Sequence, residues 1–228
     1  MKPNAMPIRS LLLGHRGARA EKSIPENTPA SFDLALAQGC DGFEFDVRLS
    51  ADGHAVICHD ASIHDLEIAK CSAEKLALPL LQEILTRYQG RAFLDIELKV
   101  SGLERITADL LRDHAPDRGY VVSSFLPGVL QTLHKIDATI PLGLICETRD
   151  QFRLWPTLPV VYVIPHYRLV QQSVVAKIKT ASKKIFVWTV NVPSDMKRVS
   201  AWGVNGLISD HPERLVRTLG GQSNPHKK

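Results

Sequence analysis

The chain has 228 residues, a formal net charge of +4 at pH 7 and 44% hydrophobic residues. This length fits one domain, and the composition is ordinary for a globular protein, which argues against a largely disordered chain. The charge is too mild to indicate nucleic-acid binding. No segment approaches the roughly 18 consecutive apolar residues of a membrane span, and the cysteines form no C-x-x-C pair.

Short β-like runs alternate with helical patterns along the whole sequence. The periodicity predicts strands at 11–17, 42–49, 92–100, 120–125, 142–147, 160–165, 184–191 and 206–209. It predicts helices at 28–38, 80–89, 103–113, 127–135, 170–181 and 194–202. Most of these strands are continuous apolar runs, which is typical of parallel strands covered by helices. Eight such strands, without a G-x-G-x-x-G loop, favour an α/β fold of the (β/α)₈ TIM-barrel type over an open sheet.

Helix-boundary residues agree with this division. Asn27 can cap a helix that has Pro29 in its first turn, and Gly39 follows the end of that helix. Ser194 precedes another predicted helix, and Gly203 follows its end.

One stretch breaks the alternation. Residues 56–60 form a further β-like run, which we expect to make a short hairpin with the second strand through the turn at Asp52-Gly53. We assign residues 1–219 to one barrel domain and expect residues 220–228, which are polar and glycine-rich, to be disordered. The apolar run at 8–13 is too short for the core of a signal peptide, so we expect a cytoplasmic protein.

Carboxylates gather in the predicted strands, whose C-terminal ends carry the chemistry of barrel enzymes. Glu44 and Asp46 project to the same side of one strand because side chains alternate along it, and Glu97 lies near the end of the next barrel strand. If that side faces the barrel interior, three buried anions repel one another and would protonate unless a cation lies among them. Ligands that are all oxygen favour Mg²⁺ or Ca²⁺ over Zn²⁺.

Two histidines and two cationic side chains accompany the carboxylates. Arg16 and Lys99 suit the oxygens of a phosphate group. His15 and His59 can exchange protons near neutral pH, and no G-x-S-x-G motif competes for the catalytic role. The position of His15 beside Arg16 favours His15 as the general acid, although the sequence does not assign the two roles. These residue types alone predict metal-assisted chemistry on an anion.

The order and spacing of the motifs resemble those of glycerophosphodiester phosphodiesterases from about residue 12 to residue 215. The first motifs are His15-Arg16-Gly17, Pro25-Glu26-Asn27-Thr28, Glu44-Phe45-Asp46-Val47 and His59-Asp60. The later ones are Glu97-Leu98-Lys99, Ser123-Ser124-Phe125, Trp188-Thr189-Val190-Asn191 and Ser209-Asp210-His211-Pro212.

The resemblance implies a TIM barrel that hydrolyses glycerophosphodiesters to an alcohol and sn-glycerol 3-phosphate. In this family the neighbouring glycerol hydroxyl is thought to attack phosphorus, giving a cyclic phosphate that water opens. By motif position the resemblance implies an acid–base pair of His15 and His59, phosphate ligands Arg16 and Lys99, pocket residues Phe125 and Trp188, and metal ligands Glu44, Asp46 and Glu97.

The segment 61–78 departs from the family pattern, because it is shorter and has no Arg-Thr-Thr run. This segment shapes the rim of the site, so the sequence leaves the alcohol preference open. A lysophospholipase D-like enzyme acting on lysolipids is one alternative, and a non-catalytic barrel that binds glycerophosphodiesters is another. We expect a small-molecule substrate, no nucleic-acid partner and no stable membrane insertion, and the sequence does not indicate an oligomeric state.

Overall fold

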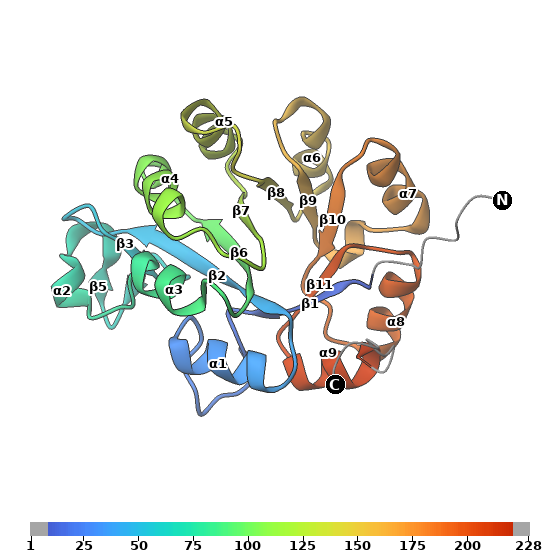
Figure 1. Ribbon diagram of the computed structural model, residues 1–228, viewed down its shortest axis with the longest axis horizontal. Coiled ribbons are helices and arrows are strands. Elements are labelled where there is room, and N and C mark those ends of the chain that lie inside the picture. The colour runs from blue at the N-terminus through green and yellow to red at the C-terminus, as the bar shows by residue number, and fades with distance from the viewer. Residues whose placement is uncertain (1–8, 221–228) are drawn as a thin grey trace.

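The computed structural model describes residues 9–220 and shows a closed barrel of parallel strands surrounded by helices (Figure 1). Around the barrel the strand order is β1, β2, β6, β7, β8, β9, β10 and β11, and β11 pairs with β1 to close the ring. The (β/α)₈ prediction is therefore confirmed. Of the tail predicted to be disordered, residues 221–228 lie outside the described part of the chain.

All eight predicted barrel strands and all six predicted helices are present, with ends that differ by a few residues. The barrel strands are β1 (Leu11–His15), β2 (Gly42–Leu49), β6 (Phe93–Leu98), β7 (Tyr120–Ser124), β8 (Leu142–Cys146), β9 (Tyr162–Pro165), β10 (Lys184–Val187) and β11 (Gly206–Ser209). The helices that correspond to predicted ones are α1 (Pro29–Ala37), α3 (Leu81–Tyr88), α4 (Glu104–Asp113), α5 (Pro127–Ile136), α7 (Gln172–Thr180) and α8 (Pro193–Ala201). The helices α2 (Ala73–Leu76), α6 (Arg149–Phe152) and α9 (Pro212–Leu219) had not been predicted.

The alternation along β2 decides which side chains enter the barrel. Phe43 and Phe45 face outward and pack on Phe32 of α1, whose ring stacks on that of Phe43 at 4.2 Å between centroids. Because side chains alternate along a strand, Glu44 and Asp46 point to the opposite side, into the barrel. The burial of the phenylalanines outside the barrel thus holds two carboxylates inside it.

Aromatic side chains fill the interior of the barrel below these carboxylates. Phe93, Tyr162 and Phe186 belong to one buried cluster, with ring centroids 5.6 Å apart for Phe93 and Phe186 and 4.8 Å apart for Tyr162 and Phe186. Such interior packing makes a barrel a solid core rather than a pore. The polar groups are therefore left to the C-terminal ends of the strands.

The predicted hairpin after the second strand is present, but its strand is shorter than expected. β3 (Ala55–Ile57) pairs antiparallel with the end of β2, and the chain leaves the ladder after Cys58 donates a backbone hydrogen bond to Asp46. Residues 61–79 then form a small insert beside the barrel. It contains β4 (Ser62–Ile63), β5 (Leu66–Glu67), the short 3₁₀-helix η1 (Ile68–Lys70) and α2 (Ala73–Leu76) (Figure 1).

Two predicted helix starts are wrong by one or two residues. Thr28, not Asn27, caps α1, because the Thr28 side chain accepts a hydrogen bond from the Ser31 backbone N–H. Helix α8 already begins at Pro193, with Val192 in the cap position, so Ser194 lies inside its first turn. Proline at the first helical position is favourable because its missing N–H would have no intrahelical partner there.

The cysteines and the helix lengths agree with two expectations from the sequence, the lack of a C-x-x-C pair and the lack of a long apolar segment. Cys40, Cys58, Cys71 and Cys146 are buried and free. Within residues 9–220, every helix is too short or too polar to cross a lipid bilayer.

Candidate active site

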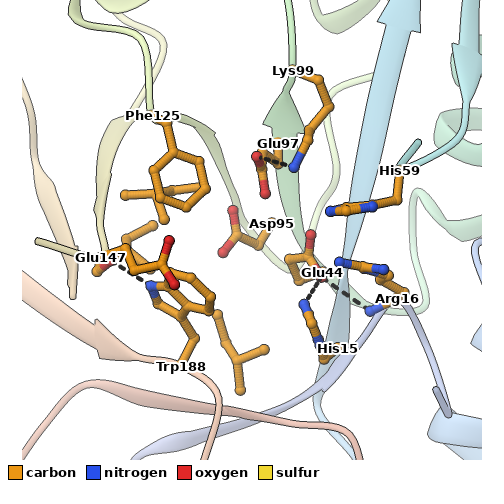
Figure 2. Close-up of a pocket in the computed structure, with 13 residues that line it drawn as sticks. His15, Arg16, Glu44, His59, Asp95, Glu97, Lys99, Phe125, Glu147 and Trp188 are labelled. Atoms are coloured by element: carbon orange, nitrogen blue, oxygen red, sulfur yellow. Dashed lines mark hydrogen bonds and ion pairs between the residues drawn. The ribbon is translucent and has the colours of Figure 1, made fainter. Parts of the chain in front are cut away.

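A pocket of about 270 Å³ opens at the C-terminal ends of the barrel strands. Every site residue predicted from the sequence lines it except Asp46, which lies buried next to the pocket. Figure 2 shows the carboxylates in the middle, the aromatic pair on one side and the two histidines on the other. The polar and aromatic lining residues are His15, Arg16, Glu44, His59, Asp95, Glu97, Lys99, Phe125, Glu147 and Trp188.

Three buried carboxylates meet at the centre of this site. Glu44 and Asp46 come from β2, and Glu97 comes from β6, where it is the register partner of Asp46. The exposed fractions of the three residues are 4%, 1% and 7%, respectively. One carboxylate oxygen from each lies within 4.8 Å of the others, which is close enough for all three to bind one ion.

The charges of this group are only partly compensated by the protein. Burial, together with Asp46 and Glu97, raises the pKa of Glu44 well above its usual value. Burial and the charge of Asp46 raise the pKa of Glu97 to about 7. The Oε1 atom of Glu44 is buried and has no hydrogen-bond partner. A hard divalent cation would remove the repulsion and coordinate this free oxygen, so these residues fit Mg²⁺ or Ca²⁺.

Arg16 and Lys99 flank the carboxylates. The Arg16 Nε lies 3.1 Å from Asp46 Oδ2, and Arg16 Nη1 donates to Glu26 Oε1 at 2.7 Å. The Lys99 Nζ lies 2.7 Å from Glu97 Oε1 and 3.3 Å from Asp46 Oδ1. Burial would raise the pKa of Asp46, but Lys99 and Arg16 hold it below its usual value. Asp46 therefore stays ionised, and both cations face the pocket beside it.

His15, at the end of β1, is held by a carboxylate that sequence analysis had given no role. His15 Nδ1 lies 2.6 Å from Asp210 Oδ1, and the Nε2 atom lies 3.7 Å from Glu44 Oε2. The other oxygen of Asp210 accepts a hydrogen bond from Asn191 Nδ2 at 2.6 Å. Burial would raise the pKa of Asp210, but His15 and Asn191 hold it well below its usual value. Asp210 is therefore an anion, and it fixes the orientation of the imidazole.

His59 has a similar partner in a more open position. His59 Nδ1 lies 2.7 Å from Asp60 Oδ1, and Arg48 Nε donates to the His59 backbone oxygen at 2.8 Å. The side chain of Asp60 is 77% exposed, whereas that of Asp210 is only 16% exposed. Burial lowers the pKa of His59, although the charge of Asp46 opposes this shift. The two histidines therefore have different electrostatic surroundings.

Two further polar residues had not been predicted as part of the site. Asn27 adopts a left-handed backbone conformation, with φ of 59°, and donates a side-chain hydrogen bond to Asp46 Oδ2 at 2.8 Å. Asp95 lies two residues before Glu97 on the same side of β6 and accepts a hydrogen bond from Ser123 Oγ at 2.6 Å. Burial raises the pKa of Asp95 to about 7. The alternation along β6 could have revealed Asp95, whereas Asn27 belonged to a family motif but was interpreted only as a helix cap.

Phe125 and Trp188 form an apolar wall on the other side of the pocket, as Figure 2 shows. Their rings are T-shaped, with centroids 5.7 Å apart, and the Lys99 Nζ lies 5.8 Å from the Phe125 centroid. Trp188 Nε1 donates to the Ile164 backbone oxygen at 2.9 Å, which fixes the indole ring. Both residues follow directly after strands that end earlier than predicted, β7 and β10.

Comparison with known proteins gives a consistent result. A glycerophosphodiester phosphodiesterase of Caldanaerobacter subterraneus subsp. tengcongensis is 29% identical over 241 residues, covering 93% of this chain and 98% of that protein. A solved structure of a putative glycerophosphoryl diester phosphodiesterase from Silicibacter pomeroyi has a TM-score of 0.86 at 21% identity, covering 95% of both chains. An Oleispira antarctica phosphodiesterase, solved in complex with the product sn-glycerol-3-phosphate, has a TM-score of 0.81 at 26% identity, covering 93% of this chain and 97% of the other.

The sequence profile of the Glycerophosphoryl diester phosphodiesterase family matches residues 15–90 and 86–214. Because these two matches span most of the chain and include the ends of the strands that carry the site, the protein belongs to the glycerophosphoryl diester phosphodiesterase family.

Proposed function

We propose that this protein hydrolyses glycerophosphodiesters to an alcohol and sn-glycerol 3-phosphate and requires a divalent cation. The observation that carries this proposal is the convergence of three buried carboxylates, two cationic side chains and two histidines on one pocket. The product named for the Oleispira antarctica relative, sn-glycerol-3-phosphate, supports the substrate class.

The cation would be held by Glu44, Asp46 and Glu97, whose oxygens are already close together. When bound, Mg²⁺ or Ca²⁺ would polarise a phosphoryl oxygen and stabilise the charge that builds up on it. Arg16 and Lys99 would bind the other phosphate oxygens, the first through its guanidinium fork and the second as a point charge. Phe125 and Trp188 would exclude water from the opposite side of the substrate.

We assign the proton transfers to the two histidines by their carboxylate partners. His15, which is oriented by the largely shielded Asp210, is placed to accept the proton of the glycerol hydroxyl as its oxygen bonds to phosphorus. His59 then donates a proton to the leaving alkoxide as the bond between phosphorus and the oxygen of the departing alcohol breaks. This assignment exchanges the two roles, because in the sequence the position of His15 beside Arg16 had favoured His15 as the general acid.

The second half of the reaction uses the same groups in the opposite roles. The first half leaves a cyclic glycerol phosphate, an unprotonated His59 and a protonated His15. His59 can then take a proton from water as the water oxygen bonds to phosphorus, and His15 returns its proton to the glycerol oxygen that leaves. The products are the free alcohol and glycerol 3-phosphate, and both histidines regain their starting states.

A glycerol 3-phosphate release assay tests the proposal. The purified protein is incubated with the glycerophosphodiesters of choline, ethanolamine and glycerol, with and without chelator, and with the lysolipid counterpart of the choline ester. We expect release from the glycerophosphodiesters only without chelator. Faster cleavage of the lysolipid would favour the lysophospholipase D alternative, and tight binding without cleavage would favour a non-catalytic barrel.

The cytoplasmic location stays a prediction, which cell fractionation would test.

A further inference from the structure

A second cavity lies next to the catalytic pocket. It has a volume of about 390 Å³, and His59 lines both cavities. We call the second cavity the His59 groove. Its walls come from the loop before α1, the end of the β2–β3 hairpin and the insert at 61–79. The apolar residues that line it are Pro25, Ile57, Cys58, Ile63, Leu78 and Pro79.

The apolar wall of the groove is held in place by the insert. Ile63 and Leu78 pack on a small core of their own, which includes Val56, Cys58 and Ile68 and is separate from the main core. Backbone hydrogen bonds fasten the insert to the hairpin, from Ile57 N to Pro79 O at 2.8 Å and from Ala51 N to Cys71 O at 2.9 Å. The groove is therefore a built surface rather than a loose rim.

The two carboxylates that line the groove already have partners. Glu26 accepts from Arg16 Nη1 at 2.7 Å, and Asp60 lies 2.7 Å from His59 Nδ1. A hydrocarbon group would cover the apolar side chains of the groove, whereas the charges of Glu26 and Asp60 are already compensated in part by Arg16 and His59. The side chains of Ile63 and Leu78 offer such apolar surface. The chemistry of the groove thus favours an apolar occupant.

We propose that the His59 groove binds the leaving alcohol, and that the protein prefers glycerophosphodiesters whose alcohol carries a hydrocarbon chain. The inference rests on the proposed function, in which His59 protonates the leaving oxygen. The atoms that follow this oxygen in the substrate must then begin beside His59, where the groove opens. The alcohol can be a simple alkanol or a lipid-derived alcohol, because both present the same methylene chain to Ile63 and Leu78.

The test uses the sn-glycerol 3-phosphate esters of ethanol, butanol and hexanol, with the choline ester as reference. We expect kcat/KM to rise about two- to fourfold for each added methylene that the groove buries. Ile63→Glu should reduce the ratio of hexyl to ethyl kcat/KM to near one, because a carboxylate replaces the apolar wall. Val161→Glu introduces the same charge on an exposed valine just before β9, at the other end of the barrel, and should leave the ratio unchanged.

Ile63→Thr is a milder variant that is less prone to misfolding, because threonine keeps the branching at Cβ and replaces only the ethyl branch of isoleucine with a hydroxyl. If Ile63→Glu is inactive on all esters, a reduced hexyl-to-ethyl ratio in Ile63→Thr supports the groove, and a wild-type ratio in it overturns the inference. A wild-type enzyme that cleaves the choline and ethyl esters but shows no rise with chain length also overturns it, while the proposed function stands. Failure on every ester would overturn both.

Discussion

The carboxylates that hold the two histidines offer a matched pair of substitutions. Asp210→Asn and Asp60→Asn each remove one charge without changing the size of the side chain. The two histidine–carboxylate distances are nearly the same, 2.6 Å for His15 and 2.7 Å for His59. The exposure of the carboxylates differs, at 16% for Asp210 and 77% for Asp60. The comparison therefore sets a largely shielded histidine–carboxylate pair against a solvent-screened one.

The expected cost of Asp210→Asn follows from the type of hydrogen bond that is lost. A net contribution of about 1.5–3 kcal/mol is typical of a hydrogen bond to a charged group, against about 0.5–1.5 kcal/mol for a neutral one. The difference of about 1–2 kcal/mol would be lost when His15 takes up its proton, so kcat should fall about 5- to 30-fold. Asp60 forms an exposed pair, which contributes little, and its substitution should cost less than about threefold.

The assay is steady-state glycerol 3-phosphate release from the choline ester, with kcat and KM measured separately. Asp210 also accepts a hydrogen bond from Asn191, so Asp210→Asn should lower stability, and the rates must be compared well below the Tm of each variant. We expect a fall in kcat with little change in KM. Equal effects of the two substitutions, or a wild-type kcat in Asp210→Asn, would refute the assignment of Asp210 to the base.

Four other predictions follow from the site. Excess chelator should abolish activity and added Mg²⁺ or Ca²⁺ should restore it, and Glu44→Gln should keep the fold by circular dichroism but lose most of the turnover. Because burial raises the pKa of Glu97 to about 7 and also raises that of Glu44, and ligands must be deprotonated, cation affinity measured by calorimetry should rise at least about tenfold from pH 6 to pH 8, and a flat profile would contradict this. His15→Ala and His59→Ala should both lose about 10²–10⁴-fold on the choline ester, but only His59→Ala should recover on a nitrophenyl diester of glycerol, whose leaving group needs no acid. A diester whose neighbouring glycerol hydroxyl is methylated should not turn over, and a normal rate would show that water attacks directly.

The barrel and its carboxylates could be predicted because they follow from periodicity within single strands. An apolar run with a polar residue near its C-terminal end predicts a strand, and the alternation along that run predicts which side of the strand the polar side chain faces. Glu44 and Asp46 illustrate this, since their spacing of two residues places them together opposite the buried phenylalanines of β2. The relative placement of two residues on one strand can be predicted without knowing how the other strands are arranged.

The helix boundaries and the hairpin were less predictable because local signals compete there. Asn27 is a good cap residue, but its left-handed backbone and its hydrogen bond to Asp46 use it for the site, and Thr28 caps the helix instead. In the segment 56–60, the β-like pattern continues beyond Ile57, where the structure leaves the ladder. The turn that carries His59 is fixed by contacts with the barrel, which a local pattern does not contain.

The carboxylate partners of the two histidines also differ in how easily the sequence predicts them. Asp60 is adjacent to His59 in the sequence and is easily found, yet its exposure weakens the pair. Asp210 is 195 residues from His15, and they meet because β11 pairs with β1, with Gly14 opposite Ser209 in the register. Closure of the barrel brings Asp210 to His15 and shields most of the pair from solvent, so the partner that we expect to have the stronger electrostatic effect is the one whose contact no local sequence pattern reveals. The paired substitutions of Asp210 and Asp60 would measure that difference.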